Sequence, residues 1–279
     1  MALPDDLNLD NTNSIQLFDY RRVHNIQKSK INLTKNVISF LRSGTKEVYG
    51  EDKIVQIEHQ HFVMMKSGNC LMTEHVSNAR NLYKSVLLFF SNEVILDFLE
   101  RNDLYEPQRQ ANQSFYVFQY DNFIEDFVKS LEKILTFPKT MQQKLLMAKF
   151  DEIMLYLTYQ HGITFLNSMI QKVGASTVRL TNIVENNKYN KLTLQELAFL
   201  SNMSVSTFKR EFFKQYQTTP IKWFHEKRLE HIALLLRTKQ TRPIDLYEAA
   251  GYENFSNFIQ AFKKRYGVTP KQYQVQISS

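Results

Sequence analysis

The sequence is poor in cysteine, glycine and proline. Its 279 residues include one cysteine, seven glycines and six prolines. The single Cys70 excludes a disulfide framework and a zinc site made of cysteines alone. The low glycine and proline content argues against a collagen-like or loop-dominated chain, and no glycine-rich phosphate loop is visible. With 43% hydrophobic and 23% charged residues, the composition is that of a globular protein, and at ~150 residues per domain the length suggests two domains.

Long hydrophobic runs are also missing. The longest are five residues, for example at 86–90 and 232–236, whereas a membrane span needs roughly 20. Residues 1–10 are acidic and lack the basic and apolar regions of a secretory signal. We therefore expect a cytoplasmic protein with no membrane partner.

The positive charge is confined to the last third of the chain. Residues 181–279 contain 15 basic and 8 acidic residues, which accounts for the whole net charge of +7, and residues 1–180 are neutral. A neutral sensor or scaffold joined to a basic module is the simplest interpretation, and a polyanion is the obvious partner of that module. A solvated basic face without a partner is the alternative.

The spacing of apolar residues divides the chain into a strand-rich part and a helical part. Short apolar segments separated by turn signals predict strands over residues 1–90, arranged as a small barrel or sandwich. Cap residues followed by apolar positions at three- and four-residue steps predict helices after Ser91, from Asp121, over 141–159 and over 163–173. Gly174 indicates a helix end, so we place the domain boundary between residues 173 and 174.

The basic third contains an internal repeat with a period of 50 residues. Residues 204–223 and 254–273 share seven identities in 20 positions, including the pairs Phe208/Phe258 and Phe212/Phe262. Such a period means that one supersecondary unit is used twice. In the first copy, apolar residues within 192–198 predict one face of a short helix. A turn at Asn202 follows, and Ser204 caps a second helix that ends near Lys214. In the second copy, residues 246–250 precede a turn at Gly251 and a helix over 255–264. Each copy therefore predicts a helix-turn-helix; the alternative is a plain helical hairpin.

Residues 221–237 connect the two copies without a glycine or proline. As a continuous helix this segment is ~25 Å long at 1.5 Å per residue. A rod of that length holds two recognition helices in successive major grooves, which lie roughly 34 Å apart on one face of B-DNA.

The last ~100 residues resemble the DNA-binding domain of the AraC/XylS family of bacterial transcription regulators. The motifs that carry the resemblance are 194–198 and 204–210 in the first copy, Arg228-Leu229 in the connecting helix, and Gly251-Tyr252, 256–258 and 266–270 in the second copy. Departures from the family pattern occur at Ile232, Pro243, Tyr247 and Gln260. The order of strands followed by helices in residues 1–173 is similar to the family's cupin-like domain, and it looks most like the subgroup that controls type III secretion genes.

The resemblance implies an α+β protein with an N-terminal cupin-like β-barrel plus helices, and an all-α C-terminal domain with two helix-turn-helix motifs on a long helix. It implies residues 1–173 as a sensing or dimerisation domain and residues 174–279 as the DNA-binding domain. It further implies a sequence-specific regulator, an activator by family habit, with double-stranded DNA and RNA polymerase as partners and a small-molecule or protein effector. No cofactor and no enzymatic activity are expected.

Helical geometry exposes one face of each expected recognition helix. Lysine and arginine suit guanine, whereas glutamine and asparagine suit adenine and an isoleucine suits a thymine methyl group. The first helix then combines base contacts with charge, and the second prefers A·T-rich DNA. Contacts to phosphates alone are the alternative for Lys209 and Arg210. The expected DNA-binding residues are Ser206, Thr207, Lys209, Arg210, Lys214, Ser256, Asn257, Ile259, Gln260, Lys263 and Lys264; Phe255 is expected in the core.

Two further interpretations concern the first domain. Residues 121–160 carry more apolar side chains than one helix face needs, so Phe127, Leu131, Leu146 and Phe150 form either a homodimer surface or part of the domain's own core. The alternative function is a cupin-type metalloprotein or enzyme with a nucleic-acid-binding tail. On that hypothesis His59 and His61 share one face of a strand and chelate a metal, with Glu74 and His75 as added ligands.

Overall fold

The computed structural model describes residues 1–3, 5–7, 13–50, 53–77, 82–104, 113–170, 176–238 and 241–278. The chain divides into two compact units, Met1–Gly174 and Ala175–Ser279. We call them the sheet unit and the helical unit. The expected boundary at residue 173/174 falls between 171 and 175, outside the described residues.

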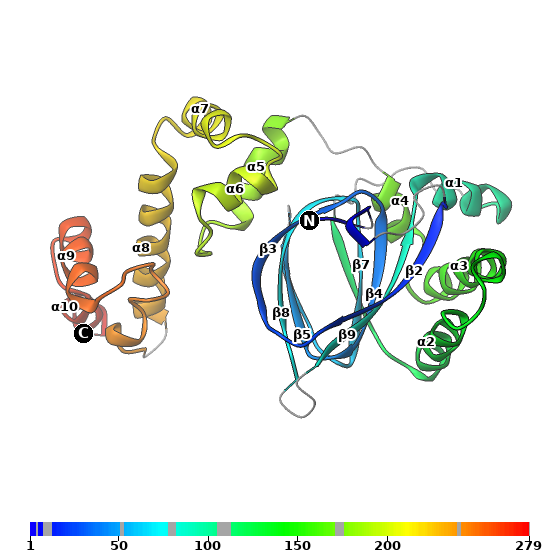
Figure 1. Cartoon of the computed structure of the whole chain (residues 1–279). Coiled ribbons are helices and arrows are strands. Elements are labelled where there is room, and N and C mark those ends of the chain that lie inside the picture. The colour runs from blue at the N-terminus through cyan, green and yellow to red at the C-terminus, as the bar shows by residue number, and fades with distance from the viewer. Residues whose placement is uncertain are drawn as a thin grey trace. The chain divides into compact units, whose positions relative to one another are not determined.

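The sheet unit is built from two five-stranded sheets that face one another (Figure 1). Adjacent strands are antiparallel in both sheets, except that β1 is parallel to β3. Among the described residues the two sheets do not join into one closed barrel. The first sheet has the order β1 (Ala2–Leu3), β3 (Ile26–Leu33), β8 (Gly68–His75), β5 (Thr45–Tyr49), β6 (Ile54–Ile57), and a 3₁₀ turn η1 (Asp5–Leu7) follows β1. The second has the order β10 (Phe115–Gln119), β7 (His61–Met65), β4 (Asn36–Ser43), β9 (Tyr83–Phe90), β2 (Ile15–Arg22).

The second sheet is buried on both of its faces. The apolar run at 86–90 lies in β9, where alternate side chains enter two different cores. Leu87 and Phe89 point between the sheets, whereas Leu88 and Phe90 pack against the helices. A strand covered on both sides needs no polar alternation, which explains why this segment is the longest apolar run in its half of the chain.

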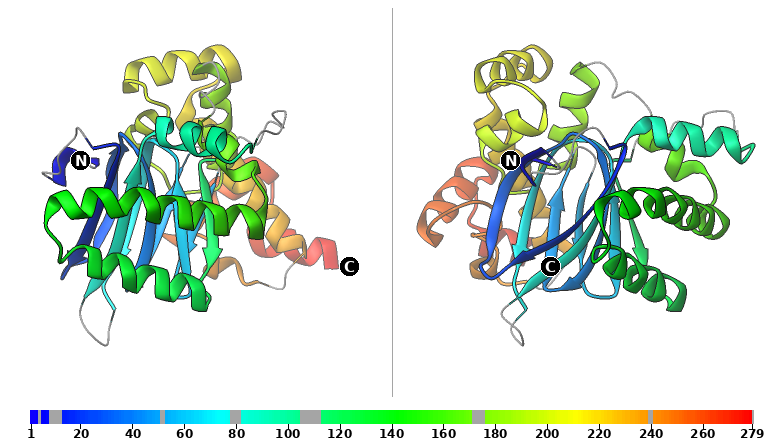
Figure 2. Two further views of the ribbon diagram at one scale, coloured as in Figure 1. Left: turned by 90° about the vertical axis from the view of Figure 1, so that its right-hand side faces the viewer. Right: turned by 45° about the vertical axis from the view of Figure 1, so that its right-hand side comes forward.

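Four helices cover the outer face of the second sheet. They are α1 (Asn92–Arg101), α2 (Asn122–Ile134), α3 (Lys139–His161) and α4 (Thr164–Ile170). Ser91 occupies the N-cap of α1, as the sequence predicts. Asp121 is the N-cap of α2, where its carboxylate accepts a hydrogen bond from the amide of Ile124. Figure 2 shows α2 and α3 crossing the strands.

The expected dimer residues lie inside this layer. Phe127, Leu131, Leu146 and Phe150 are at most 3% exposed and belong to the core between the sheet and its helices. Their assignment to a dimer surface is therefore wrong for the folded protomer, because side chains that complete the protomer's own core are unavailable to a second copy. The outer side of α3 instead exposes Met141, Met147, Leu155 and Tyr159.

The helical unit contains two three-element units in succession. The first comprises α5 (Ser176–Asn186), α6 (Leu194–Leu200) and α7 (Val205–Tyr216); the second comprises α8 (Pro220–Thr238), the 3₁₀ turn η2 (Pro243–Asp245) and α9 (Phe255–Tyr266), followed by α10 (Pro270–Ser278). The turn residue Asn202 has a left-handed backbone (φ 56°), and so does Gly251 (φ 86°).

One expected helix does not form. Residues 246–250 are a series of turns after η2 rather than an α-helix. In the first unit, Thr193 and Glu196 form a complete capping box that starts α6. In the second, the N-cap is Arg242, whose side chain makes no cap hydrogen bond, and Pro243 follows it. The second unit therefore starts with a 3₁₀ turn that lacks the capping box of the first.

In the part of the chain that the structure describes, no helix is both long and apolar enough to cross a bilayer.

Candidate nucleic-acid interface

The two helix-turn-helix units share one aromatic frame. Phe208 and Phe212 have ring centroids 5.8 Å apart on α7, and Phe258 and Phe262 have the same separation on α9. All four rings are fully buried. An aromatic ring from the following helix completes each frame. The ring centroid of Trp223 lies 5.8 Å from that of Phe212, and the ring centroid of Tyr273 lies 5.4 Å from that of Phe262. The matching geometry confirms that the sequence repeat is one structural unit used twice.

The structure extends this repeat toward the N-terminus, beyond what we found in the sequence. Arg179 of α5 donates from Nε to the carbonyl oxygen of Leu200 at 3.2 Å, and Arg228 of α8 donates from Nε to that of Ala250 at 3.1 Å. Each arginine therefore holds the turn that precedes a recognition helix. The missed signal is a second Arg-Leu pair, Arg179-Leu180, 49 residues before Arg228-Leu229.

The connecting helix α8 carries both units. It has 19 residues, which corresponds to ~28 Å at 1.5 Å per residue. Trp223 and Phe224 near its start pack on α7, and Leu229, Ile232 and Leu236 enter the core around α9. Figure 1 shows α7 and α9 at opposite ends of α8. The uninterrupted helix predicted between the two copies is thus present.

The outer face of α7 is polar and mostly basic. Ser204 caps the helix by accepting a hydrogen bond from the amide of Thr207, so the first turn is fixed. Arg210 and Lys214 both reach the Glu211 carboxylate, at 3.0 and 3.2 Å, and the two basic side chains are each 65% exposed. The hydrogen bonds from both cations lower the pKa of Glu211. Of the predicted residues, Ser206, Lys209, Arg210 and Lys214 are exposed and Thr207 is half-buried.

Two features of α7 were not anticipated. Phe213, for which we predicted no environment from the sequence, is 53% exposed on the same helix. Glu211 was not recognised as the partner of Arg210 and Lys214, although its three-residue spacing from Lys214 is the signal for such a pair.

The outer face of α9 has a different chemistry. Asn254 caps the helix through the amide of Asn257. Ser256, Asn257, Gln260, Lys263 and Lys264 are exposed, and Ile259 is half-buried. The charged side chains lie in the last turn of the helix, where their positive charge interacts favourably with the negative end of the helix dipole. Phe255, expected in the core, is only half-buried.

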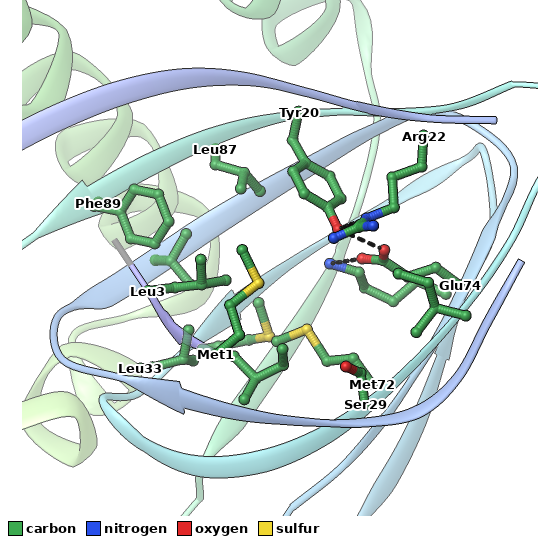
Figure 3. A pocket seen from close by; sticks show the side chains of 15 residues that line it. Met1, Leu3, Tyr20, Arg22, Ser29, Leu33, Met72, Glu74, Leu87 and Phe89 are labelled. Atoms are coloured by element: carbon green, nitrogen blue, oxygen red, sulfur yellow. Dashed lines mark hydrogen bonds and ion pairs between the residues drawn. The ribbon is translucent and has the colours of Figure 1, made fainter. Parts of the chain in front are cut away.

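Between the two sheets of the sheet unit lies a small polar network (Figure 3). Lys46 and Glu74 form a buried ion pair at 3.3 Å, the Tyr20 hydroxyl donates to Glu74 at 3.0 Å, and Arg22 donates to the Tyr20 oxygen. Burial raises the pKa of Tyr20 to about 12. The adjoining cavity of about 30 Å³ is lined mostly by apolar side chains, so it has room for little more than water.

The proposed metal ligands do not come together. His59 lies in the turn before β7 and not on a strand with His61, and Glu74 is occupied by Lys46 and Tyr20. Within the described ranges no group of three or more metal-ligating side chains is found. Burial raises the pKa of the Cys70 thiol to about 12, which disfavours the nucleophilic thiolate.

Two protein families match this chain. Residues 36–168 match the family described as the ExsA N-terminal regulatory domain, and residues 197–276 match a helix-turn-helix domain family. These ranges fall in the sheet unit and the helical unit, respectively.

Similar individual proteins are transcription regulators by name. The virulence regulon transcriptional activator VirF of Yersinia enterocolitica is 26% identical over 160 residues, which cover 56% of this chain and 58% of VirF. The regulator ExsA of Pseudomonas aeruginosa is 26% identical over 44% of each chain. The chain thus spans about half the length of these relatives. Among solved structures, ToxT of Vibrio cholerae aligns over 95% of this chain and 99% of its own at 12% identity, with a TM-score of 0.37.

Proposed function

Because the chain belongs to the AraC/XylS family of transcription regulators, we propose that it binds specific DNA sequences and activates transcription. In this proposal α7 and α9 enter two successive major grooves of one duplex. The interface comprises the eleven predicted residues on these helices. RNA polymerase is the partner through which bound protein acts, and the cytoplasm, where bacterial DNA lies, is the site of action. The proposal includes no catalytic activity.

One observation carries this proposal. Two matching aromatic frames present two helices with exposed polar faces, and both frames contact one continuous helix, α8. The helical unit also contains the entire net positive charge of the chain. A duplicated helical hairpin used only for packing has no need of exposed recognition faces or of a charge excess, whereas a polyanionic duplex requires both.

The test is selection of double-stranded DNA from a random pool by the full chain, followed by affinity measurements on the selected operator and on random DNA. Arg210→Ala and Gln260→Ala should weaken operator binding more than random binding, because a bidentate base contact is worth roughly 1–3 kcal/mol of discrimination. Lys139→Ala, which removes an exposed charge in the sheet unit, is the control and should change neither. Failure to enrich any sequence, or equal losses on both DNAs, would contradict sequence-specific binding.

The sheet unit has a regulatory role in this proposal, in response to a small molecule or a partner protein. With a cavity of only about 30 Å³ between the sheets, a small-molecule effector has to displace lining side chains, whereas a protein effector does not. Titration of the full chain with candidate effectors, read by operator affinity, tests this role.

Homodimer formation is a further part of the proposal, but through the outer side of α3 instead of the four buried residues that the sequence suggested. The outer side of α3 exposes Met141, Leu155 and Tyr159, which recur at intervals of 14 and four residues and so share one helix face. Sedimentation of the full chain should show a concentration-dependent dimer that Leu155→Glu abolishes. Glu100→Gln on α1 is an exposed control; unchanged sedimentation of Leu155→Glu would refute this surface.

A further inference from the structure

The two helix-turn-helix units have grooves at equivalent places. Each groove lies between the start of the unit's first helix or turn and the first turn of the helix that follows the recognition helix. In the first unit it is a hollow of about 210 Å³, lined by residues 192–194, Leu197, Pro220, Ile221, Phe224, His225 and Arg228. In the second unit it is a groove of about 540 Å³.

The groove of the second unit reaches the recognition helix itself. Phe255 and Ile259, one turn apart on α9, form one wall, while Pro243 and Ile244 of η2 and Pro270 of α10 form the others. The groove of the first unit contains no residue of α7. The repeat aligns Phe255 with Val205 and Ile259 with Lys209, so a larger ring and an apolar side chain replace a small residue and a cation.

The two units differ in the element that borders the groove. In the first unit Leu194 begins α6 directly after the Thr193 cap. In the second unit η2 replaces that helix, and Ile244 is left 51% exposed beside the groove. An apolar wall exposed next to polar recognition residues marks a binding surface more than a core.

The surroundings of the groove identify what it binds. Ile259 precedes Gln260 directly and lies one turn before Lys263. Gln260 and Lys263 are exposed on the predicted DNA-reading face. Lys271 also lines the groove, and among the described residues it has no acidic partner. The other basic lining residue, Arg242, is paired with Asp245 at 2.9 Å. An apolar wall flanked by unpaired positive charge suits a DNA strand, whose thymine methyl groups are the apolar features of the major groove.

We propose that Phe255 and Ile259 form an apolar wall that recognises the C5-methyl group of a thymine, while Lys271 binds the neighbouring backbone phosphate. This inference rests on the proposed DNA-binding function and specifies its second half. The first unit reads its half-site with charge, and the second reads its own through shape and apolar contact. Specificity for thymine then arises at Ile259, the position that aligns with Lys209 of the first unit.

The experiment uses the full chain and the operator selected as described above. Each thymine of the half-site that responds to Gln260→Ala is replaced, one at a time, by deoxyuridine, which lacks only the methyl group. One such replacement should weaken binding by about four-fold to ten-fold, as expected for one buried methyl group. In Ile259→Ala the same replacement should have a clearly smaller effect, because only the Phe255 part of the wall that contacts the methyl group remains.

Two further variants sharpen the assignment. Ile259→Lys copies the first unit and should shift the selected base at that position from thymine toward guanine. Lys271→Ala should weaken operator and random DNA alike and reduce the salt dependence by about one phosphate contact. Lys209→Ala in the first unit is the matched control and should leave the deoxyuridine effect unchanged. Because Ile259 is half-buried beside the fully buried Phe258 and Phe262, its replacement leaves the aromatic frame intact.

The outcomes separate this inference from the proposed function. If no sequence is enriched, sequence-specific DNA binding itself fails. If an operator is obtained but no thymine of the second half-site responds to deoxyuridine, or if the response is undiminished in Ile259→Ala, the thymine-reading wall is wrong. If Ile259→Ala keeps both operator affinity and the deoxyuridine response but loses transcription activation, the groove is a protein contact and the proposal is overturned.

Discussion

The two helix-turn-helix units agree closely in their interiors and differ on their surfaces. Both contain a phenylalanine pair at 5.8 Å, an aromatic side chain from the following helix, and an arginine bonded to the turn carbonyl. Outside this frame, α7 presents Lys209 and Arg210, whereas α9 presents Ile259 and Gln260. The first helix of the first unit has a capping box, and its counterpart is only a 3₁₀ turn.

This comparison shows which positions a duplicated unit keeps. Close-packed interiors tolerate little change in volume or shape, so the buried aromatic residues are retained in both copies. Exposed positions contribute little to the free energy of folding, and several of them, such as Lys209/Ile259 and Arg210/Gln260, differ in charge or polarity between the two copies. A basic first surface and a mixed second surface are therefore compatible with one shared frame.

The largest expected effect comes from breaking each frame in turn. Phe212→Ala and Phe262→Ala should each lower the free energy of unfolding of the helical unit by about 3–5 kcal/mol, because both rings are fully buried and leave a cavity. Urea unfolding followed by the fluorescence of Trp223, the single tryptophan of the chain, measures both. Phe213→Ala, at an exposed ring, is the control; a loss below 1 kcal/mol at either buried ring would show that the units do not share a frame.

A smaller effect is expected from the two turn-holding arginines. Arg179→Ala and Arg228→Ala each remove a charge-assisted hydrogen bond to a turn carbonyl, a contribution of about 1.5–3 kcal/mol. Each variant should weaken binding chiefly at the half-site of its own unit, as read by footprinting of the selected operator. Arg101→Ala, which removes an exposed arginine of the sheet unit, is the control and should leave both half-sites unchanged. Equal losses at both half-sites would indicate that the arginines act on the whole unit.

The smallest expected effect is a pH dependence of the unfolding free energy that comes from His225 on α8, in the second unit. Burial, together with the charge of Arg228, lowers the pKa of His225, which lies near Tyr252 with ring centroids 5.7 Å apart. The folded protein then binds fewer protons than the unfolded chain, so the contribution of His225 is complete above its ordinary pKa of about 6.5 and declines as the pH falls below it. His225→Gln should flatten the fall in unfolding free energy between about pH 7.5 and 5.5. An unchanged slope would exclude His225 as its source.

The sequence predicted the helical unit better than the sheet unit. The repeat located α7, α8 and α9 because identical aromatic residues recur at a fixed interval and helix contacts are local. In the sheet unit, strands were predicted within residues 1–90, but the apolar segments did not locate β2 and β3, and β10 lies beyond that range. Strands β2 and β3 carry polar side chains such as Asp19 and Lys28, and β10 follows α1 in the chain; their pairing depends on partners far away in sequence.

Other site features depended on packing that no local pattern reveals. The four apolar residues at 127, 131, 146 and 150 were compatible with either a dimer surface or a core, because periodicity identifies an apolar face but not what covers it. Phe255 was expected in the core because it aligns with Val205, and the structure leaves it on the wall of a groove. The shortened first element, η2, contributes Pro243 and Ile244 to that groove.

By itself the sequence determined the two-part organisation, the distribution of charge and the duplicated helix-turn-helix units, since composition and local periodicity are sufficient for these. Only the tertiary structure decided which apolar side chains are covered, which carbonyl each arginine holds, and where the second unit opens a groove. Burial and hydrogen bonding between distant segments depend on which elements pack together in the folded protein, and the spacing of residues along the chain does not specify those contacts.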